Sequence, residues 1–184
     1  RIANDVIKKI INREVKINGF KGMVLSYVSE YEEIVNNIII ESLKKMSDHT
    51  FLQSYISEKI LGYISEKAKN NKESYDLIED DKKTIKVLDS RNRDIDHAKR
   101  FRIMNKILEH NNFETISFEE YKCSILDLRN SLSHIHTKND DIENIHYVFH
   151  INNQEQILTP EYCSEIRRLL SSYKMRLLDI SSRL

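Results

Sequence analysis

The chain has 184 residues, of which 40% are hydrophobic and 32% are charged, and a chain of this size normally folds as one domain around an apolar core. Its 29 basic and 29 acidic residues give a formal net charge of zero, which argues against nucleic-acid binding through bulk charge. Three glycines and one proline are too few for the turns of a many-stranded sheet, so the composition favours long helices.

The sequence also indicates where the protein resides. Cys123 and Cys163 are the only cysteines and show no disulfide-framework or zinc-motif spacing. No apolar run approaches the roughly eighteen residues of a membrane span, and no signal-peptide pattern opens the chain. We therefore expect a soluble, cytoplasmic protein with no membrane association. Because the first residue is Arg1 rather than Met, we also expect a processed chain or a piece of a larger protein, whose remainder could hold a sensor.

Helical periodicity dominates the first part of the chain. A short amphipathic helix is expected within residues 3–16, and Asn18-Gly19 then predicts a break. A long core helix follows over residues 20–46. A second helix is expected over residues 48–69, with Asp48 as its candidate N-cap. Residues 1–17 are interpreted as a linker or an appended helix.

The segment from Lys82 to Lys106 is strongly basic. It carries nine basic residues against three acidic ones, a net charge of plus six. A helix is expected from about Asp94 to His110, ended by Asn111-Asn112. The segment is the best electrostatic candidate for an RNA-binding track, and a solvated basic helix that balances the preceding acidic run is an equal alternative. The candidate RNA contacts in it are Arg91, Arg93, Lys99, Arg100 and Arg102.

The next helix is expected from Ser117, where the S-x-x-E pattern of a capping box begins, to about His136. Wound at about 100° per residue, it has an apolar seam of Ile125, Leu128, Leu132 and Ile135. Two polar stripes lie beside the seam, one of Asp127, Asn130 and His134 and one of Arg129, Ser133 and His136. These residue types suit phosphate binding and proton transfer. A surface helix without chemistry also shows a polar face opposite a seam.

The pattern changes after this helix. Residues 138–141 break it, and two-residue alternation over residues 145–158 around Asn152-Asn153 predicts a small β-hairpin. Thr159-Pro160 supplies an N-cap and a first-turn proline for a closing helix. The expected fold class is therefore all-α, a helical bundle with a small β-hairpin between the Ser117 helix and the C-terminal helix.

A short motif within this helix resembles a known family. Arg129-Asn130-Ser131-Leu132-Ser133-His134 is similar to the R-N-x-x-x-H motif of HEPN domains, small helical modules of which many are metal-independent ribonucleases in toxin, phage-defence and CRISPR-associated systems. The motif covers six residues, and its placement late in a helical chain extends the resemblance in organisation from about Gly19 onward. The resemblance implies a single HEPN-like helical domain over residues 1–184.

Metal-free RNA cleavage sets the chemistry expected of the motif. A proton must leave the ribose 2′-OH, a crowded phosphorane must be stabilised and the departing 5′-oxygen must be protonated. Histidine transfers protons near neutral pH, and arginine presents a planar fork of donors to phosphate. The resemblance implies that His134 transfers protons, Arg129 binds phosphate and Asn130 orients them, with Ser133 as a further RNA contact. The products would carry 2′,3′-cyclic phosphate and 5′-hydroxyl ends.

A second copy of the motif is also implied. Arg129 and His134 are expected about 140° apart around one helix axis, so they converge better across an interface than along one helix. The resemblance implies a homodimer with a composite active site, or pairing with a second HEPN unit. RNA is the expected substrate, and an antitoxin or a sensor domain or subunit is a further candidate partner.

Other readings of these residues remain open. His136 is a candidate catalytic residue, a phosphate ligand or an incidental histidine at a fraying helix end. No cofactor and no metal site are predicted, because the spacing of His134, His136, His146 and His150 matches no zinc motif. The alternative function is a catalytically inactive HEPN-like module that dimerises or binds a nucleotide or a partner.

Overall fold

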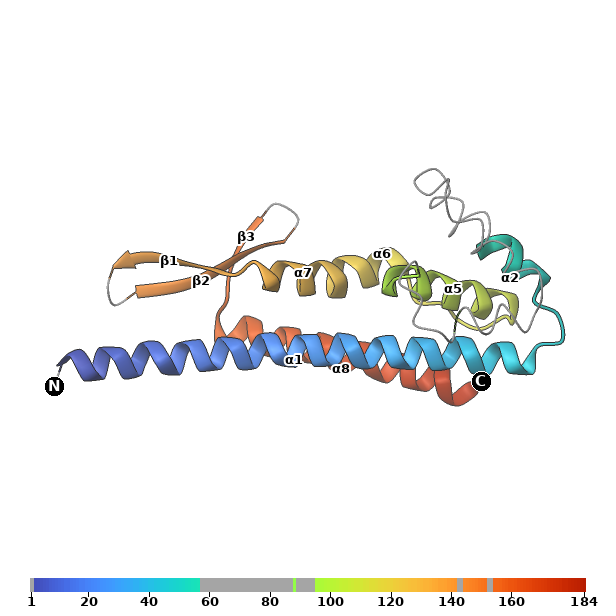
Figure 1. The fold of residues 1–184 in the computed structure, drawn as a ribbon, viewed down its shortest axis with the longest axis horizontal. Helices are drawn as coiled ribbons and strands as arrows, with labels where there is room; N and C mark the ends of the chain where they lie inside the picture. The colour runs from blue at the N-terminus through green and yellow to red at the C-terminus, as the bar shows by residue number, and fades with distance from the viewer. Residues whose placement is uncertain (1, 57–87, 89–94, 142–143, 152–153) are drawn as a thin grey trace, which may run out of the picture. The chain divides into compact units, whose positions relative to one another are not determined.

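The structure is a computed structural model that describes residues 2–56, 88, 95–141, 144–151 and 154–184 (Figure 1). These residues are mainly helical, as predicted, and include a small three-stranded antiparallel sheet. The chain divides into two compact units. The first unit contains Arg1–Glu30 and Tyr121–Met175, and the second unit contains Tyr31–Glu120 and Arg176–Leu184.

Helix α1 runs without interruption from Ile2 to Lys45, so the break predicted at Asn18-Gly19 is wrong. Ile17 and Phe20, on either side of it, are buried, whereas Gly19 is exposed and has open space around it. A glycine inside a helix costs about 1 kcal/mol relative to alanine, which the burial of neighbouring apolar side chains offsets. Residues 2–17, predicted as a linker or an appended helix, therefore continue the same helix.

The first unit contains the start of α1, the sheet, and the helices that precede and follow the sheet in the sequence. In chain order it contains a π-helical turn Lys122–Leu126, α7 Asp127–Ser133, β1 His136–Asp141, β2 Asn144–Ile151, β3 Gln154–Ile157 and most of α8 Pro160–Arg183. Its core consists of Ile17, Phe20, Val24, Val28, Tyr121, Ile125, Leu128, Leu132, Val148, Phe149, Ile166, Leu170 and Tyr173. The side chains of the sheet, α1, α7 and α8 thus share one apolar interior.

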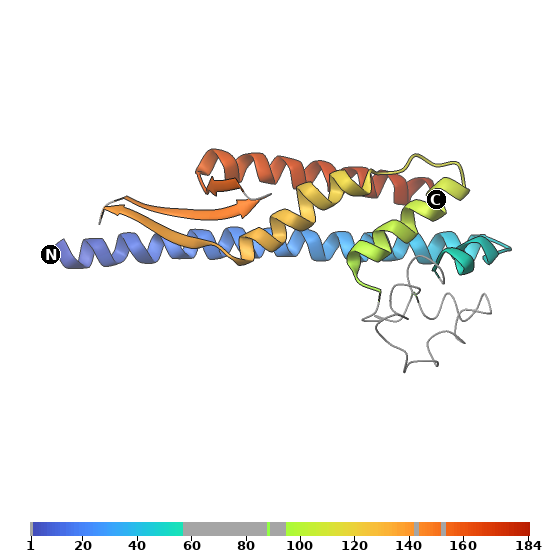
Figure 2. The ribbon, with the colours of Figure 1, turned by 90° about the horizontal axis from the view of Figure 1, so that it is seen from above.

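The sheet has β2 in its centre and pairs antiparallel on both sides (Figures 1 and 2). Strands β2 and β3 confirm the predicted hairpin. Strand β1 was not predicted, because its polar residues show no alternation that marks a strand. It pairs with β2 so that His136 lies opposite Val148, while His150 on β2 lies opposite Glu155 on β3.

Helix α8 begins where the sequence predicts. Pro160 is its first residue, and the hydroxyl of Thr159 accepts a hydrogen bond of 3.1 Å from the backbone N–H of Tyr162. This bond satisfies one of the amides that a helix N-terminus leaves without an internal partner.

The second unit contains the rest of α1, α2 Thr50–Tyr55, α5 His97–His110 and the start of α6 Phe118–Tyr121. Asp96 caps α5 by accepting a 2.9 Å hydrogen bond from the N–H of Lys99. Asn112 leaves the helix with a positive φ of 58°, as expected of an asparagine beyond a helix end. Ser117 accepts from the N–H of Glu120 at 3.3 Å, which confirms the predicted cap.

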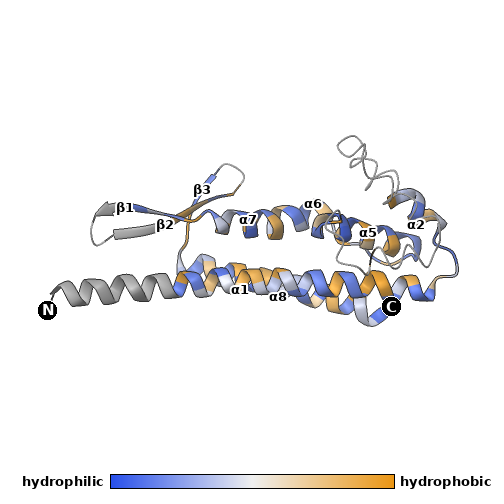
Figure 3. Cartoon of the chain, in the orientation of Figure 1, coloured by the Kyte–Doolittle hydropathy of each residue, from blue (hydrophilic) through white to orange (hydrophobic). Residues whose placement is uncertain are grey.

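The core of the second unit lies mainly on α1 and α5, where hydrophobic and hydrophilic residues alternate around α5 (Figure 3). Its larger buried side chains are Tyr31, Ile38, Ile39, Leu43, Leu52, Ile56, Leu88, Ile95, Phe101, Ile103, Met104, Ile107 and Leu108. The helix predicted over residues 48–69 is seen as α2 from Thr50, with His49 and not the predicted Asp48 at its N-cap position, and residues 57–69 lie outside the described residues. No helix in the described ranges combines the length and the apolar character that crossing a membrane requires.

Candidate functional site

The motif lies on α7 and on the connection that follows it, all within the first unit. The N–H of Asp127 donates to the carbonyl of Lys122, five residues earlier, and closes the π-helical turn that leads into α7. Such turns are rare and often occur at functional sites. Leu128 and Leu132 are buried, as is Ile125 in the π-helical turn, so these three residues of the predicted seam are confirmed as core.

His134 does not belong to the helix, and the prediction that the helix runs to His136 is wrong. Helix α7 ends at Ser133, and His134 follows it with φ −111° and ψ 25°. The N–H of His134 donates to the carbonyl of Ser131 at 3.0 Å. The helix stops because the residues from His136 onward pair with β2, a long-range interaction that local periodicity does not report. The predicted angle of about 140° around one axis therefore does not describe Arg129 and His134.

The three central motif side chains are accessible. Arg129 is half-buried, whereas Asn130 and His134 are exposed. None of the three side chains forms a hydrogen bond or ion pair with another residue in the described part of the chain. Ser133 is also exposed, and its hydroxyl donates to the carbonyl of Arg129 at 3.2 Å. A cationic fork, an amide and an imidazole are thus available to a ligand from one helix end.

Arg129 borders a small hollow against α1. The hollow has a volume of about 40 Å³ and is lined by Lys21, Val24, Leu25, Arg129, Leu132 and Ser133. A water molecule occupies about 30 Å³ in the liquid, so the hollow has room for a water or a single ligand oxygen and not for a nucleotide. Lys21 and Arg129 place two cations at its edge, and Leu25 beside them is 50% exposed. Sequence reasoning missed Lys21 and Leu25, because only the fold brings α1 to the motif.

His136 lies on β1 and not on the polar stripe predicted with Arg129 and Ser133. Its ring stacks on that of His150, with centroids 5.7 Å apart and planes 12° apart. Both histidines are exposed. The sequence places His150 within the predicted hairpin, and the unpredicted strand β1 supplies its neighbour His136.

An ion pair lies on the same face of the sheet as these histidines. The Nζ of Lys138 lies 2.9 Å from Oε1 of Glu155. The hydrogen bond from Lys138, together with the nearby charges of Lys138, His150 and His136, holds the pKa of Glu155 below its usual value. The face is therefore rich in imidazole and ammonium groups and has one ionised carboxylate among the described side chains.

The candidate RNA contacts of the basic segment belong to the second unit, and Arg91 and Arg93 lie outside the described residues. Lys99 is half-buried with its Nζ 3.9 Å from Asp96 Oδ2. Arg102 is exposed, and its guanidinium carbon lies 4.0 Å from the ring centroid of Phe118, a cation–π geometry.

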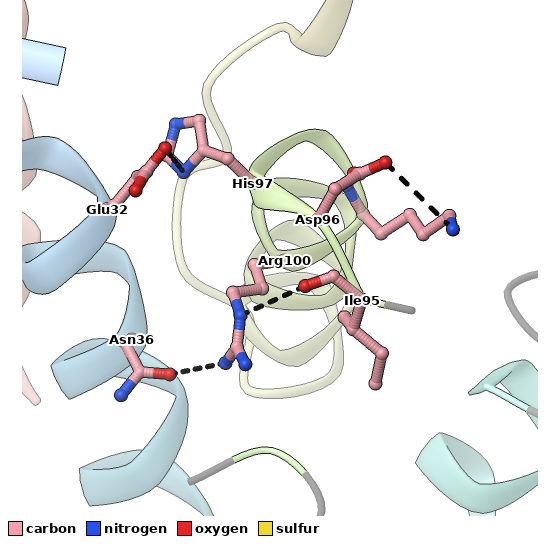
Figure 4. Close-up of polar contacts among 7 residues, drawn as sticks. Glu32, Asn36, Ile95, Asp96, His97 and Arg100 are labelled. Atoms are coloured by element: carbon pink, nitrogen blue, oxygen red, sulfur yellow. Dashed lines mark hydrogen bonds and ion pairs between the residues drawn. The ribbon is translucent and has the colours of Figure 1, made fainter. Parts of the chain in front are cut away.

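Arg100 differs from Lys99 and Arg102 because it is buried, with 9% of its surface exposed. Its guanidinium donates to Asn36 Oδ1 at 2.6 Å and to the carbonyl of Ile95 at 3.3 Å (Figure 4). It also donates to the carbonyl of Leu88 at 2.5 Å. These bonds connect α5 to α1 and to the segment before α5. The proposal that Arg100 contacts RNA is corrected accordingly: its charged group is occupied inside the second unit.

His97 lies next to Arg100 in the same set of polar contacts. Its Nδ1 is 4.0 Å from Glu32 Oε1 on α1 (Figure 4). The start of α5 thus contacts α1 through two side chains, the guanidinium of Arg100 and the imidazole of His97.

A metal centre is not formed by the residues that the structure describes. No group of three or more His, Cys, Asp or Glu side chains within those ranges is arranged to hold an ion.

Comparisons with protein-family models, with curated proteins and with solved structures each found no match.

Proposed function

We propose that the chain is a metal-independent endoribonuclease of HEPN type that acts in antiviral defence or in a toxin–antitoxin system. The observation that carries the proposal is the end of α7, where Arg129, Asn130 and His134 are accessible and make no side-chain bond to another described residue. Their order matches the R-N-x-x-x-H motif. If these groups served only to stabilise the fold, we would expect them to form ion pairs or hydrogen bonds with other residues.

The proposed reaction uses each group for one task. His134 accepts the proton of the ribose 2′-OH, and the resulting oxygen attacks the adjacent phosphorus while the bond to the 5′-oxygen breaks. Arg129 binds the non-bridging phosphate oxygens and stabilises the phosphorane. Asn130 donates or accepts a hydrogen bond that orients the substrate. The leaving 5′-oxygen takes up a proton from a second group that acts as the acid, and the products are a 2′,3′-cyclic phosphate and a 5′-hydroxyl.

A second copy of the chain would complete the site. One copy supplies a single imidazole of the motif, whereas base and acid roles at one phosphate are most simply filled by two groups. A homodimer with a composite cleft supplies both groups, and the exposed Leu25 beside Arg129 is a residue at which such an interface can be tested.

Cleavage of labelled RNA in the presence of a chelator tests the activity. We expect His134→Ala and Arg129→Ala each to reduce the rate by about a hundredfold or more, with cyclic phosphate ends in the wild-type products. Arg167→Ala, which removes an exposed arginine of the same unit, is the matched control and should cleave normally. Wild-type rates in both motif variants would refute the assigned roles.

Mixing the two inactive variants tests the composite site. If each cleft takes Arg129 from one copy and His134 from its partner, a mixed dimer contains one intact cleft. Equal amounts of the two variants should then recover about a quarter of the wild-type rate, because half of the dimers are mixed. Recovery of none of the rate would mean that both residues of a cleft lie on the same copy, or that one cleft requires the imidazoles of both copies.

The alternative function is a catalytically inactive module that dimerises or binds a nucleotide or a partner. Leu25 beside the motif is exposed, so it could contact a partner in this inactive module as well as in the dimeric enzyme. A stable dimer by light scattering, with no cleavage of any RNA and a loss of dimer in Leu25→Lys, would support the inactive module.

A further inference from the structure

One face of the sheet, which also carries the buried Val148 and the exposed Ile157, continues the motif along the chain with a set of polar residues. In an antiparallel sheet, residues that lie directly opposite each other point to the same face, as do residues two apart on one strand. The register places His136 on β1 opposite Val148 on β2. His150 lies two residues after Val148 on β2, and it lies opposite Glu155 on β3. Lys138 lies two residues beyond His136 on β1. His136, Lys138, His150 and Glu155 therefore share one face, which we name the histidine face.

The two imidazoles of the histidine face lie close together and are exposed. Their ring centroids are 5.7 Å apart with nearly parallel planes. Each protonated imidazole presents two N–H donors, and two like charges this close repel each other. A bound anion removes that repulsion and accepts hydrogen bonds from both rings. The pair is thus better suited to an anion than to a cation.

The net charge of the histidine face depends on the protonation of its two imidazoles. Lys138 and Glu155 neutralise each other through their 2.9 Å contact, and the lowered pKa of Glu155 keeps this carboxylate ionised. With both imidazoles neutral the four groups sum to about zero, and with both protonated they sum to about plus two. A polyanion is attracted to the second state and not repelled by the first.

The histidine face also lies next to the proposed site of cleavage. His134 and His136 are separated by one residue, so their Cα atoms are at most about 7 Å apart. An RNA strand whose scissile phosphate lies at His134 would have a neighbouring phosphate within reach of His136 and His150. His136 and His150 are both exposed, so neither is a core residue.

We propose that the histidine face is a phosphate-contacting surface that holds the RNA strand beside the cleaved bond. The proposal rests on the ribonuclease function proposed above and specifies how its substrate is held. It assigns His136 and His150 to phosphate contacts, and it assigns Glu155 a restraining role because this carboxylate opposes the binding of RNA.

Anisotropy of a fluorescently labelled single-stranded RNA tests the surface directly. The full chain carries His134→Asn so that the RNA stays intact, and the buffer is at about pH 6, because acidic conditions favour the cationic form of imidazole. Adding H136N and H150N should weaken binding about tenfold at low salt. It should also lower the slope of log affinity against log salt by about 1.4, because each single-strand phosphate contact contributes about 0.7.

Glu155→Gln gives a result of opposite sign. Removing this carboxylate takes one negative charge from the face, so RNA should bind about threefold more tightly. Glu161→Gln is the matched control, since Glu161 is an exposed carboxylate of the same unit at the start of α8, and it should leave the affinity unchanged. Circular dichroism verifies that each variant is folded.

The outcomes separate this inference from the proposed function. Unchanged affinity and salt slope in the H136N and H150N variant would overturn the inference, as would Glu155→Gln binding no more tightly than its control, even if His134→Ala abolishes cleavage. A parent chain that binds no RNA would also overturn it. Binding that depends on the histidine face in a chain that never cleaves RNA would support the surface and refute the ribonuclease.

Discussion

Replacing Arg100 with methionine should destabilise the second unit strongly. Methionine keeps much of the buried aliphatic volume and removes the guanidinium, which donates to Asn36, Leu88 and Ile95. The carbonyls of Leu88 and Ile95 belong to residues that are 0% and 2% exposed, so water reaches them poorly. Asn36 is half-buried and can reorient toward solvent.

The expected loss follows from these three acceptors. A buried acceptor left without its donor costs about 1–3 kcal/mol, and the two carbonyls account for most of it, whereas the amide of Asn36 contributes little. Removing a buried charge returns part of this cost because the guanidinium is no longer desolvated. The net destabilisation is about 3 kcal/mol, which corresponds to a fall of roughly 6–12 °C in Tm for a chain of this size.

Urea unfolding followed by circular dichroism measures this difference. Lys106→Met is the matched control, because it removes a positive charge from the same helix. The Nζ of Lys106 lies 3.0 Å from Glu109 at the surface, and such a pair contributes at most about 0.5 kcal/mol. Arg100→Lys should fall between the two, since lysine keeps the charge and loses the planar fork. If Arg100→Met costs no more than Lys106→Met, the guanidinium is not held inside the unit and the residue returns to the candidate RNA contacts.

Three further changes test other parts of the fold. Asp96→Ala should cost about 1 kcal/mol because it removes the cap of α5, whereas Asp96→Asn should keep most of the stability; equal losses in thermal melts would contradict the cap. Leu128→Ala should cost about 3 kcal/mol through the cavity it leaves in the first unit, and a loss under 1 kcal/mol in urea unfolding would show that α7 is not packed there. Cys123 is exposed, and burial raises the pKa of the Cys163 thiol, which lowers its thiolate fraction at a given pH. Iodoacetamide should therefore label Cys123 faster, as peptide mass spectrometry would show, and equal rates would refute this difference.

Local signals in the sequence predict much of the fold. The caps at Ser117 and Thr159 and the proline at 160 act on amides within three residues, so their effect is readable from the chain. The apolar seam of Leu128 and Leu132 follows helical periodicity in the same way. These features depend on neighbours along the chain and not on distant residues.

Long-range contacts account for what the sequence does not predict. Strand β1 consists of polar residues that become a strand only because β2 lies beside them, and this pairing ends α7 at Ser133 and removes His136 from the helix. Gly19 stays helical because its neighbours Ile17 and Phe20 are buried. A count of positive charges likewise treats Arg100 as a surface residue, although its partners on α1 place it inside.

The candidate site can be predicted only as a set of residue types. The motif identifies Arg129, Asn130 and His134 from the sequence, and the structure adds that all three are accessible. Lys21 and His150 are recognised only after folding, since one comes from α1 and the other from a strand paired with an unpredicted neighbour.

The end of α7 at Ser133 divides the motif between two systems of backbone hydrogen bonds. Arg129 is held by the helical ladder, whereas the chain after His134 is held by the β1–β2 ladder. Local opening of one ladder leaves the other intact, because such units open with separate free energies. Separation of β1 from β2 would therefore release the side of the motif that carries His134, while Arg129 stays in place on its helix.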